Sequence, residues 1–168
     1  MSVILIGMPG CGKSTTGVVL AKSLGMDFVD TDILIQQREK LRLQQIIDRD
    51  GIDSFLDAEE RAICGFAREG CVIATGGSAV LREKAMLHLK SLGPVVYLEL
   101  GLPELVLRLG DISSRGIALS TGRTIADLFV ERIPLYVRWA DVTVDCSGLP
   151  FERVVDRIVD AVPGFHKG

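Results

Sequence analysis

The sequence has few of the residues from which metal centres and disulfide frameworks are built. Its 168 residues include four cysteines and two histidines, and no two cysteines have CxxC spacing. Because a structural zinc ion needs a cluster of such ligands, we expect no zinc site. Scattered cysteines in a chain of this length are typical of reduced thiols, and we expect a cytoplasmic protein.

Features that direct proteins to membranes or nucleic acids are also missing. No apolar run approaches the roughly 18 residues that a membrane span requires, and no basic leader precedes a long apolar segment. A formal net charge of −3 argues against nonspecific nucleic-acid binding. No internal repeat or linker divides the chain. We therefore expect residues 1–168 to form one domain, a monomer or weak dimer, whose partner is a small molecule.

A glycine-rich stretch is the strongest signal present. Residues 7–14 read GMPGCGKS, after the apolar run 3–6 and before a helical pattern that begins at Lys13. In this strand–loop–helix setting, G-x-x-x-x-G-K-S indicates a loop that binds nucleotide phosphates. The alternative is a glycine-rich turn that matches by chance, which the flanking strand and helix make rarer.

The chemistry of phosphate binding explains these residue types. Glycines let the backbone approach an anion closely, and the N–H groups that open the next helix point at it. Lys13 would place its charge on the outer phosphates, and Ser14 would offer its hydroxyl to Mg²⁺. We expect ATP and Mg²⁺ as cofactors, with the nucleotide held by Gly10, Cys11, Gly12, Lys13, Ser14 and Thr15.

Short apolar segments alternate with helical patterns along the chain. This alternation predicts an α/β fold of three layers, in which helices cover both faces of a five-stranded parallel sheet. The expected strands are 3–6, 27–30, 71–74, 95–98 and 142–145, and the expected helices are 13–24, 32–38, 43–48, 54–68, 82–91, 103–109, 124–138 and 151–162.

Local signals refine these boundaries. Ser54 with Asp57, and Thr124 with Asp127, have the spacing of helix N-terminal capping pairs. Pro134 predicts a kink or break in its helix. Residues 110–122 are rich in glycine, serine and arginine and lack periodicity, so we expect a lid loop.

Two carboxylates follow the second expected strand. Asp30 and Asp32 are two residues apart, at the sheet edge where ligands bind in parallel α/β folds. One could hold a water molecule of the Mg²⁺ shell and the other could orient an acceptor hydroxyl. Positioning matters more than base strength in phosphoryl transfer, so ordinary aspartates would suffice. Capping of the next helix by either residue is the alternative.

Several segments together resemble the shikimate kinases. They are residues 7–15, residues 28–32 (FVDTD) and residues 74–77 (ATGG), supported by 115–119 (RGIAL) and 131–136 (ERIPLY). The resemblance spans almost the whole chain in the right order. It implies a small P-loop kinase of the nucleoside-monophosphate-kinase type, with a five-stranded parallel sheet, that phosphorylates a hydroxyl of shikimate.

The resemblance also implies roles for individual residues. Asp30 would assist Mg²⁺ and Asp32 would contact the acceptor hydroxyls. Arg115 would reach the ATP phosphates from the lid, Arg132 would bind the substrate carboxylate, and Arg108 would pack near adenine. Two other arginines, Arg123 and Arg138, are rivals for the roles of Arg115 and Arg132.

This chain departs from the family pattern mainly on the acceptor side. Leu56 stands where the family has a second carboxylate-binding arginine, residues 76–78 read GGS in place of three glycines, and 115–118 read RGIA in place of RPLL. One lost hydrogen bond to a charged group would weaken shikimate binding roughly ten- to a hundredfold. Asp53 or Asp57 could receive an ammonium group instead, which would suit homoserine.

We therefore expect an ATP- and Mg²⁺-dependent kinase with Lys13, Asp32 and Arg115 as catalytic residues, and with Mg²⁺ on Ser14 and Asp30. The lid would close over ATP to exclude water. Shikimate is the first candidate acceptor, before homoserine or a sugar acid. A nucleotide-binding regulatory module without catalysis is the alternative from another class. The expected substrate-binding residues are Asp32, Gly76, Gly77, Ser78, Arg132 and Asp57.

Overall fold

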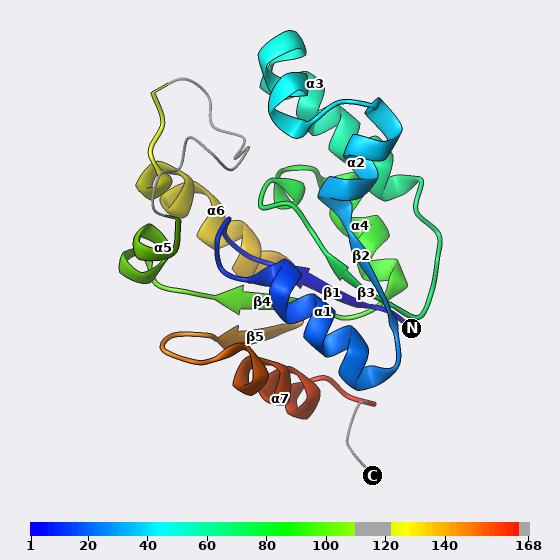
Figure 1. Cartoon of the computed structure of the whole chain (residues 1–168), viewed down its shortest axis with the longest axis vertical. Coiled ribbons are helices and arrows are strands. Elements are labelled where there is room, and N and C mark those ends of the chain that lie inside the picture. The colour runs from blue at the N-terminus through cyan, green and yellow to red at the C-terminus, as the bar shows by residue number, and fades with distance from the viewer. Residues whose placement is uncertain (110–121, 165–168) are drawn as a thin grey trace.

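A five-stranded parallel sheet forms the centre of the computed structural model, which describes residues 1–109 and 122–164 (Figure 1). The strand order is β2-β3-β1-β4-β5. The strands are β1 (Val3–Ile6), β2 (Asp27–Asp30), β3 (Cys71–Ala74), β4 (Val95–Glu99) and β5 (Val142–Asp145).

Helices cover both faces of this sheet, as the alternation of apolar segments predicts. α1 (Lys13–Leu24) and α7 (Phe151–Ala161) pack together over one face, while α4 (Glu83–Leu92) and α6 (Ile125–Trp139) cover the other (Figure 1). Because β1 and β3 are sandwiched between these layers, all their residues are buried. Continuous apolar runs are the sequence signature of such strands. The predicted α/β fold is confirmed.

Two helices extend the molecule beyond the β2 edge. α2 (Thr31–Glu39) packs against α3 (Leu43–Cys64), and the two share a small apolar core of their own. The remaining elements are α5 (Leu102–Leu109) and a single 3-10 turn, η1 (Ala79–Leu81), which the sequence pattern did not predict. No helix in the described part of the chain is long and apolar enough to cross a membrane.

The helix boundaries agree with most of the local signals. Gly25 ends α1 in a left-handed conformation, with φ of 65°. Thr124 and Asp127 form the predicted capping box at the start of α6. Gly51 interrupts the helical backbone within α3, with φ of 82° and ψ of 171°. The predicted boundary between helices 43–48 and 54–68 is therefore present as a kink between two helical parts.

Two local predictions are wrong. Ser54 lies inside α3, so it does not cap a helix with Asp57, and α3 ends at Cys64, before the predicted end at Arg68. Of the kink or break expected at Pro134, the break does not occur, because α6 continues to Trp139, while the kink stays a prediction. Pro134 and Val130 both face solvent. Water can therefore satisfy the Val130 carbonyl, which a proline four residues later leaves without its helical hydrogen bond.

Most of the predicted lid lies outside the described residues. Residues 110–121 belong to neither described range, and Arg115 is among them. Only Gly122, at the far end of the predicted loop, is described, in a turn with φ of 88°. The lid and the role of Arg115 stay predictions.

Candidate active site

The phosphate-binding motif forms the loop between β1 and α1. Its glycines adopt backbone conformations that other residues rarely reach, with φ of 82° at Gly10 and 99° at Gly12. The space beside them is also occupied: a Cβ on Gly12 would lie 2.8 Å from the ring of Phe151. The glycines are therefore required here both by conformation and by packing.

Lys13 lies in the hollow of this loop. Its Nζ donates to the carbonyl oxygens of Gly7 at 2.8 Å and Met8 at 2.9 Å, and the residue is only 8% exposed. The loop thus holds a nearly buried ammonium through its own backbone, at the base of the helix whose first N–H groups are unsatisfied. This is an anion-binding arrangement.

Ser14 and the two predicted aspartates form one hydrogen-bonded chain. The Ser14 hydroxyl donates to Oδ2 of Asp30 at 2.7 Å, and Oδ1 of Asp30 accepts from the backbone N–H of Asp32 at 2.9 Å. Asp30 therefore caps α2 through Oδ1, which is the helix-capping role that the sequence left open, while Oδ2 contacts the phosphate loop. A hydroxyl and a carboxylate in contact are the oxygen ligands that Mg²⁺ prefers.

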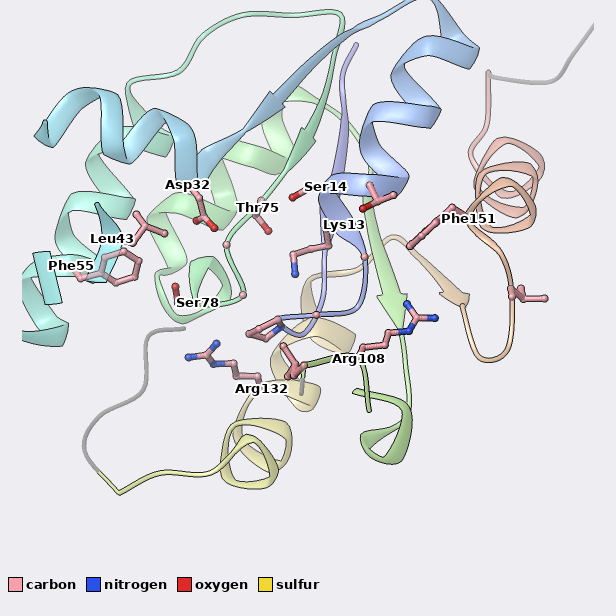
Figure 2. Close-up of a pocket in the computed structure, with 18 residues that line it drawn as sticks. Lys13, Ser14, Asp32, Leu43, Phe55, Thr75, Ser78, Arg108, Arg132 and Phe151 are labelled. Atoms are coloured by element: carbon pink, nitrogen blue, oxygen red, sulfur yellow. The ribbon is translucent and has the colours of Figure 1, made fainter. Parts of the chain in front are cut away.

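A cavity of about 650 Å³ connects the loop with the ends of the neighbouring strands (Figure 2). Arg108 and Phe151 lie at one end of it, and Asp32, Phe55, Ser78 and Arg132 at the other, with the loop between. It is lined by Pro9, Gly10, Gly12, Lys13, Ser14, Thr15, Asp32, Leu43, Phe55, Thr75, Gly76, Gly77, Ser78, Arg108, Leu109, Arg132, Leu149 and Phe151.

A guanidinium and an aromatic ring bound the end of the cavity beside α5 and α7. Arg108 donates to Glu104 at 2.6 Å and reaches the carbonyl oxygen of Cys11 at 3.4 Å, which holds its guanidinium against the loop. Phe151, 37% exposed at the start of α7, lies against Gly12. A planar base can stack on either group.

The segment after β3 builds the other end. Gly76 donates its N–H to Thr31 Oγ1 at 3.0 Å, and the Gly77 carbonyl accepts from the Tyr136 hydroxyl at 2.7 Å. A Cβ on Gly77 would lie 2.8 Å from Pro9 of the phosphate loop and 3.2 Å from Nη1 of Arg132. Gly77 therefore brings the phosphate loop and α6 into contact.

Two carboxyl groups flank Gly76. Its absent Cβ would lie 2.6 Å from Oε1 of Glu59 and 2.8 Å from Oδ1 of Asp32. Burial raises the pKa of Asp32 to about 6, with a further increase from the charge of Asp30 and an opposing effect of Lys13. Asp32 is therefore mostly ionised at neutral pH.

Glu59 lies beneath this segment and is fully buried. Its Oε2 accepts a 2.8 Å hydrogen bond from the Ser78 hydroxyl, whereas Oε1 has no hydrogen-bond partner in the described part of the chain. Burial raises the pKa of this carboxyl to about 7; the Ser78 hydrogen bond opposes that increase, as do Arg132 and Lys13, while Asp32 adds to it.

The structure brings most of the predicted site residues to this cavity, but not all. Cys11 is buried beneath the loop, and Asp30 contacts Ser14 without lining the cavity. Asp57 is not at the cavity, because its carboxylate pairs with Arg82 at 2.7 Å on the exposed side of α3. Asp53 is exposed as well, and Leu56 packs in the small core of α2 and α3. None of these three can contact a ligand in the cavity.

The rival arginines are also placed elsewhere. Arg123 pairs with Glu131, and Arg138 lies 5.1 Å over the ring of Trp139, near Glu83. Neither lines the cavity, whereas Arg132 does and is 2% exposed.

Other lining residues were not identified from the sequence. Glu59, buried beneath the cavity, was not identified either, although it lies one turn after Leu56, where the chain departs from the family pattern. Two lining residues near the C-terminal end, Leu149 and Phe151, lie far from any motif in the sequence. Two others, Leu43 and Phe55, come from α3. Apolar residues of this kind cannot be told from core residues without the tertiary structure.

Comparison with known proteins gives a consistent result. The family model described as shikimate kinase matches residues 9–163. The shikimate kinase of Pasteurella multocida is 36% identical, and the match covers 98% of this chain and 97% of that protein. Threonine synthase-like 1 of Homo sapiens is 32% identical over 98% of this chain, which spans only 23% of that longer protein.

Solved structures agree in fold. A shikimate kinase of Acinetobacter baumannii in complex with shikimate has a TM-score of 0.86 at 27% identity, covering 95% of this chain and 90% of that one. A shikimate kinase of Aquifex aeolicus has a TM-score of 0.79 at 33% identity, covering 95% and 94%.

Proposed function

The chain belongs to the shikimate kinase family, and we propose that it transfers the terminal phosphoryl group of ATP to a hydroxyl of a small carboxylate metabolite. One observation carries the proposal above all. A single cavity contains the phosphate loop, the partly buried Asp32 and the guanidinium of Arg132, so that a triphosphate, a hydroxyl and a carboxylate can be held together.

In this proposal the nucleotide occupies the loop and the end of the cavity beside Arg108. The N–H groups at the start of α1 and the ammonium of Lys13 bind the phosphates. Lys13 exchanges its contacts with the carbonyls of Gly7 and Met8 for contacts with phosphate oxygens. Phe151 and Arg108 hold the base between a ring and a guanidinium.

Ser14 and Asp30 would hold Mg²⁺, because a hydroxyl and a carboxylate lie within hydrogen-bond distance of each other and Mg²⁺ prefers oxygen ligands. When bound, Mg²⁺ neutralises charge on the transferred phosphoryl group. Ser14 binds the ion through its hydroxyl, while Asp30 orients that hydroxyl from behind and keeps the first turn of α2 in place.

Asp32 and Arg132 would position the acceptor. The ionised carboxylate of Asp32 accepts a hydrogen bond from the acceptor hydroxyl and aligns its oxygen with the phosphoryl group. Arg132 binds the acceptor carboxylate through its guanidinium. Arg115, which lies outside the described residues, is proposed as the lid arginine that contacts the phosphates from above.

Shikimate is the first acceptor to test, because it is the ligand named with a structural relative of this chain. Homoserine is the second candidate. It is favoured by Leu56, which stands where the family pattern has a second carboxylate-binding arginine, and by relatives named threonine synthase-like 1, since threonine is itself a hydroxy amino acid.

The test is an assay of ADP release with a panel of acceptors: shikimate, L-homoserine and several sugar acids. We expect ADP release that depends on one of them and on Mg²⁺. The Asp32→Asn variant should lose turnover while its affinity for ATP, measured by calorimetry, stays within about twofold. A protein that binds ATP but releases no ADP with any acceptor would be a regulatory module and would contradict the proposal.

A further inference from the structure

A carboxyl that the proposed reaction does not use, that of Glu59, is buried beneath the acceptor end of the cavity. We propose that Ser78 and Glu59 together recognise a hydrogen-bond donor on the acceptor, and that the preferred acceptor is a hydroxy amino acid, whose ammonium group lies next to its carboxylate. This inference rests on the proposed function and narrows its acceptor class.

The direction of the Ser78 hydrogen bond is the first observation. A serine hydroxyl has one proton, and Ser78 donates it to Oε2 of Glu59 at 2.8 Å. The oxygen of Ser78, which lines the cavity, is then left with its lone pairs. While Glu59 is ionised, Ser78 can therefore only accept a hydrogen bond from a ligand, which selects an N–H or O–H group.

The environment of Glu59 is the second observation. The residue is fully buried, Oε1 has no hydrogen-bond partner, and no ion pair joins it to a basic side chain within residues 1–109 and 122–164. Placing a carboxylate in such surroundings is costly, and Arg132 and Lys13 offset only part of that cost, since burial still raises the pKa of Glu59. An ammonium group bound at Ser78 would add a further positive charge, separated from Glu59 by one hydroxyl.

Leu56 brings no positive charge to Glu59 from α3. It precedes Glu59 by one turn of α3, but its apolar side chain packs with Phe55 and other residues of the small α2–α3 core. No basic group therefore comes from this part of α3 to Glu59, and a ligand can provide one.

Arg132 and Ser78 lie at the same end of the cavity (Figure 2). Nη1 of Arg132 lies 3.2 Å from the absent Cβ of Gly77, the residue that precedes Ser78. A carboxylate bound at Arg132 and an ammonium bound at Ser78 would then lie at the same end of the cavity, as the two groups of an α-amino acid require. Asp32, beyond Gly76, remains available for the hydroxyl (Figure 2).

A matched pair of acceptors provides the test. L-Homoserine and 4-hydroxybutyrate share their carbon chain, hydroxyl and carboxylate and differ only in the α-ammonium group. If Ser78 and Glu59 recognise that group, kcat/KM for L-homoserine should exceed that for 4-hydroxybutyrate about ten- to a hundredfold, the range of a hydrogen bond to a charged group.

Two variants connect this preference to the residues. Glu59→Gln retains an oxygen that can accept from Ser78 but cannot become charged, and Ser78→Gly removes the hydroxyl without disturbing the backbone. Each should reduce the preference to within about threefold of unity and leave KM for ATP unchanged. Glu60→Gln, on the same helix and outside the cavity, is the charge-matched control and should retain the preference.

The pH dependence gives an independent readout. The carboxyl of Glu59, with Asp32, Arg132 and Lys13 as the charged groups that face it, has a pKa of about 7. KM for L-homoserine should therefore fall as the pH rises through 7 in the parent protein, and this change should be absent in Glu59→Gln.

Equal use of the two acceptors, or a preference that persists in both variants, would overturn the inference. So would efficient phosphorylation of shikimate with no use of L-homoserine, an outcome that would leave the proposed kinase function intact. If no acceptor caused ADP release, the kinase proposal and this inference would fail together.

Discussion

The ammonium nitrogen of Lys13 lies 2.8 Å from the carbonyl oxygen of Gly7, at the opposite end of the phosphate loop. The same nitrogen lies 2.9 Å from the carbonyl of Met8. Lys13 therefore connects the two sides of the loop through its side chain as well as through the backbone. The charge that would bind phosphate also helps to shape the hollow that receives it.

Replacing Lys13 by alanine should remove both effects. We expect the affinity for ADP, measured by calorimetry, to fall at least about tenfold, because a charge-assisted hydrogen bond contributes roughly 1.5–3 kcal/mol. Lys22→Ala, at the exposed end of the same helix, is the control and should bind ADP as the parent does. An unchanged affinity in Lys13→Ala would exclude the loop as the phosphate site.

Asp32 should set the acid limit of activity. Burial and the charge of Asp30 raise its pKa to about 6, and the ionised form is the one that aligns the acceptor hydroxyl. The rate at saturating ATP should therefore fall about tenfold for each pH unit below 6. A rate independent of pH between 5 and 7 would remove Asp32 from this role.

Glu59 should make the protein less stable as the pH rises. Its pKa is about 7 in the folded state against an ordinary value of 4.5, so between these values the folded protein binds more protons than the unfolded chain. By linkage, the free energy of unfolding then decreases with increasing pH.

The variant Glu59→Gln should lose this dependence. From pH 5 to pH 8 its stability, measured by urea denaturation, should rise relative to the parent by about 2–3 kcal/mol. Glu60→Gln should follow the parent. A parallel response of Glu59→Gln and the parent would mean that Glu59 is already ionised at pH 5.

Gly77 should be sensitive to the smallest substitution. A methyl group there would press on Pro9 at 2.8 Å and approach Arg132, so the phosphate loop or the guanidinium must move. We expect Gly77→Ala to lower kcat/KM for the acceptor at least about tenfold, since small misplacements of reacting groups are costly. Gly101→Ala, where the nearest atom is 3.8 Å away, is the control and should have parent activity.

Phe151 should affect the nucleotide and not the acceptor. Its ring lies against Gly12 at the end of the cavity that contains Arg108. Stacking of a base on an aromatic ring contributes about 1–3 kcal/mol, so Phe151→Leu should raise KM for ATP roughly tenfold and leave KM for the acceptor unchanged. Leu107→Ala, on the exposed side of α5, provides the comparison. A shift in the acceptor KM alone would place the base elsewhere.

The phosphate loop and the sheet could be predicted because their signals are local. The G-x-x-x-x-G-K-S pattern specifies its own backbone conformation, and buried parallel strands are continuous apolar runs bounded by turns. The helix at Thr124 was equally predictable, since a capping box involves residues only three positions apart.

The acceptor end could not be predicted in the same way. Asp57 was expected to bind the substrate because it follows Leu56 directly in the chain. In the structure α3 directs Asp57 outward to Arg82 and directs Glu59 inward to Ser78. A difference of two positions rotates a side chain by more than half a turn of the helix. Only the packing of α3 against the sheet determines which of these carboxylates reaches the interior.

The sequence by itself determined the fold class, the anion-binding loop and the pair Asp30 and Asp32, because each depends on neighbours within one element or on the turn beside it. Tertiary structure alone decided that Gly76 would lie between Asp32 and Glu59 and that Phe151 would lie beside Arg108. These contacts join residues from elements distant in the chain, and only the packed core brings such elements together.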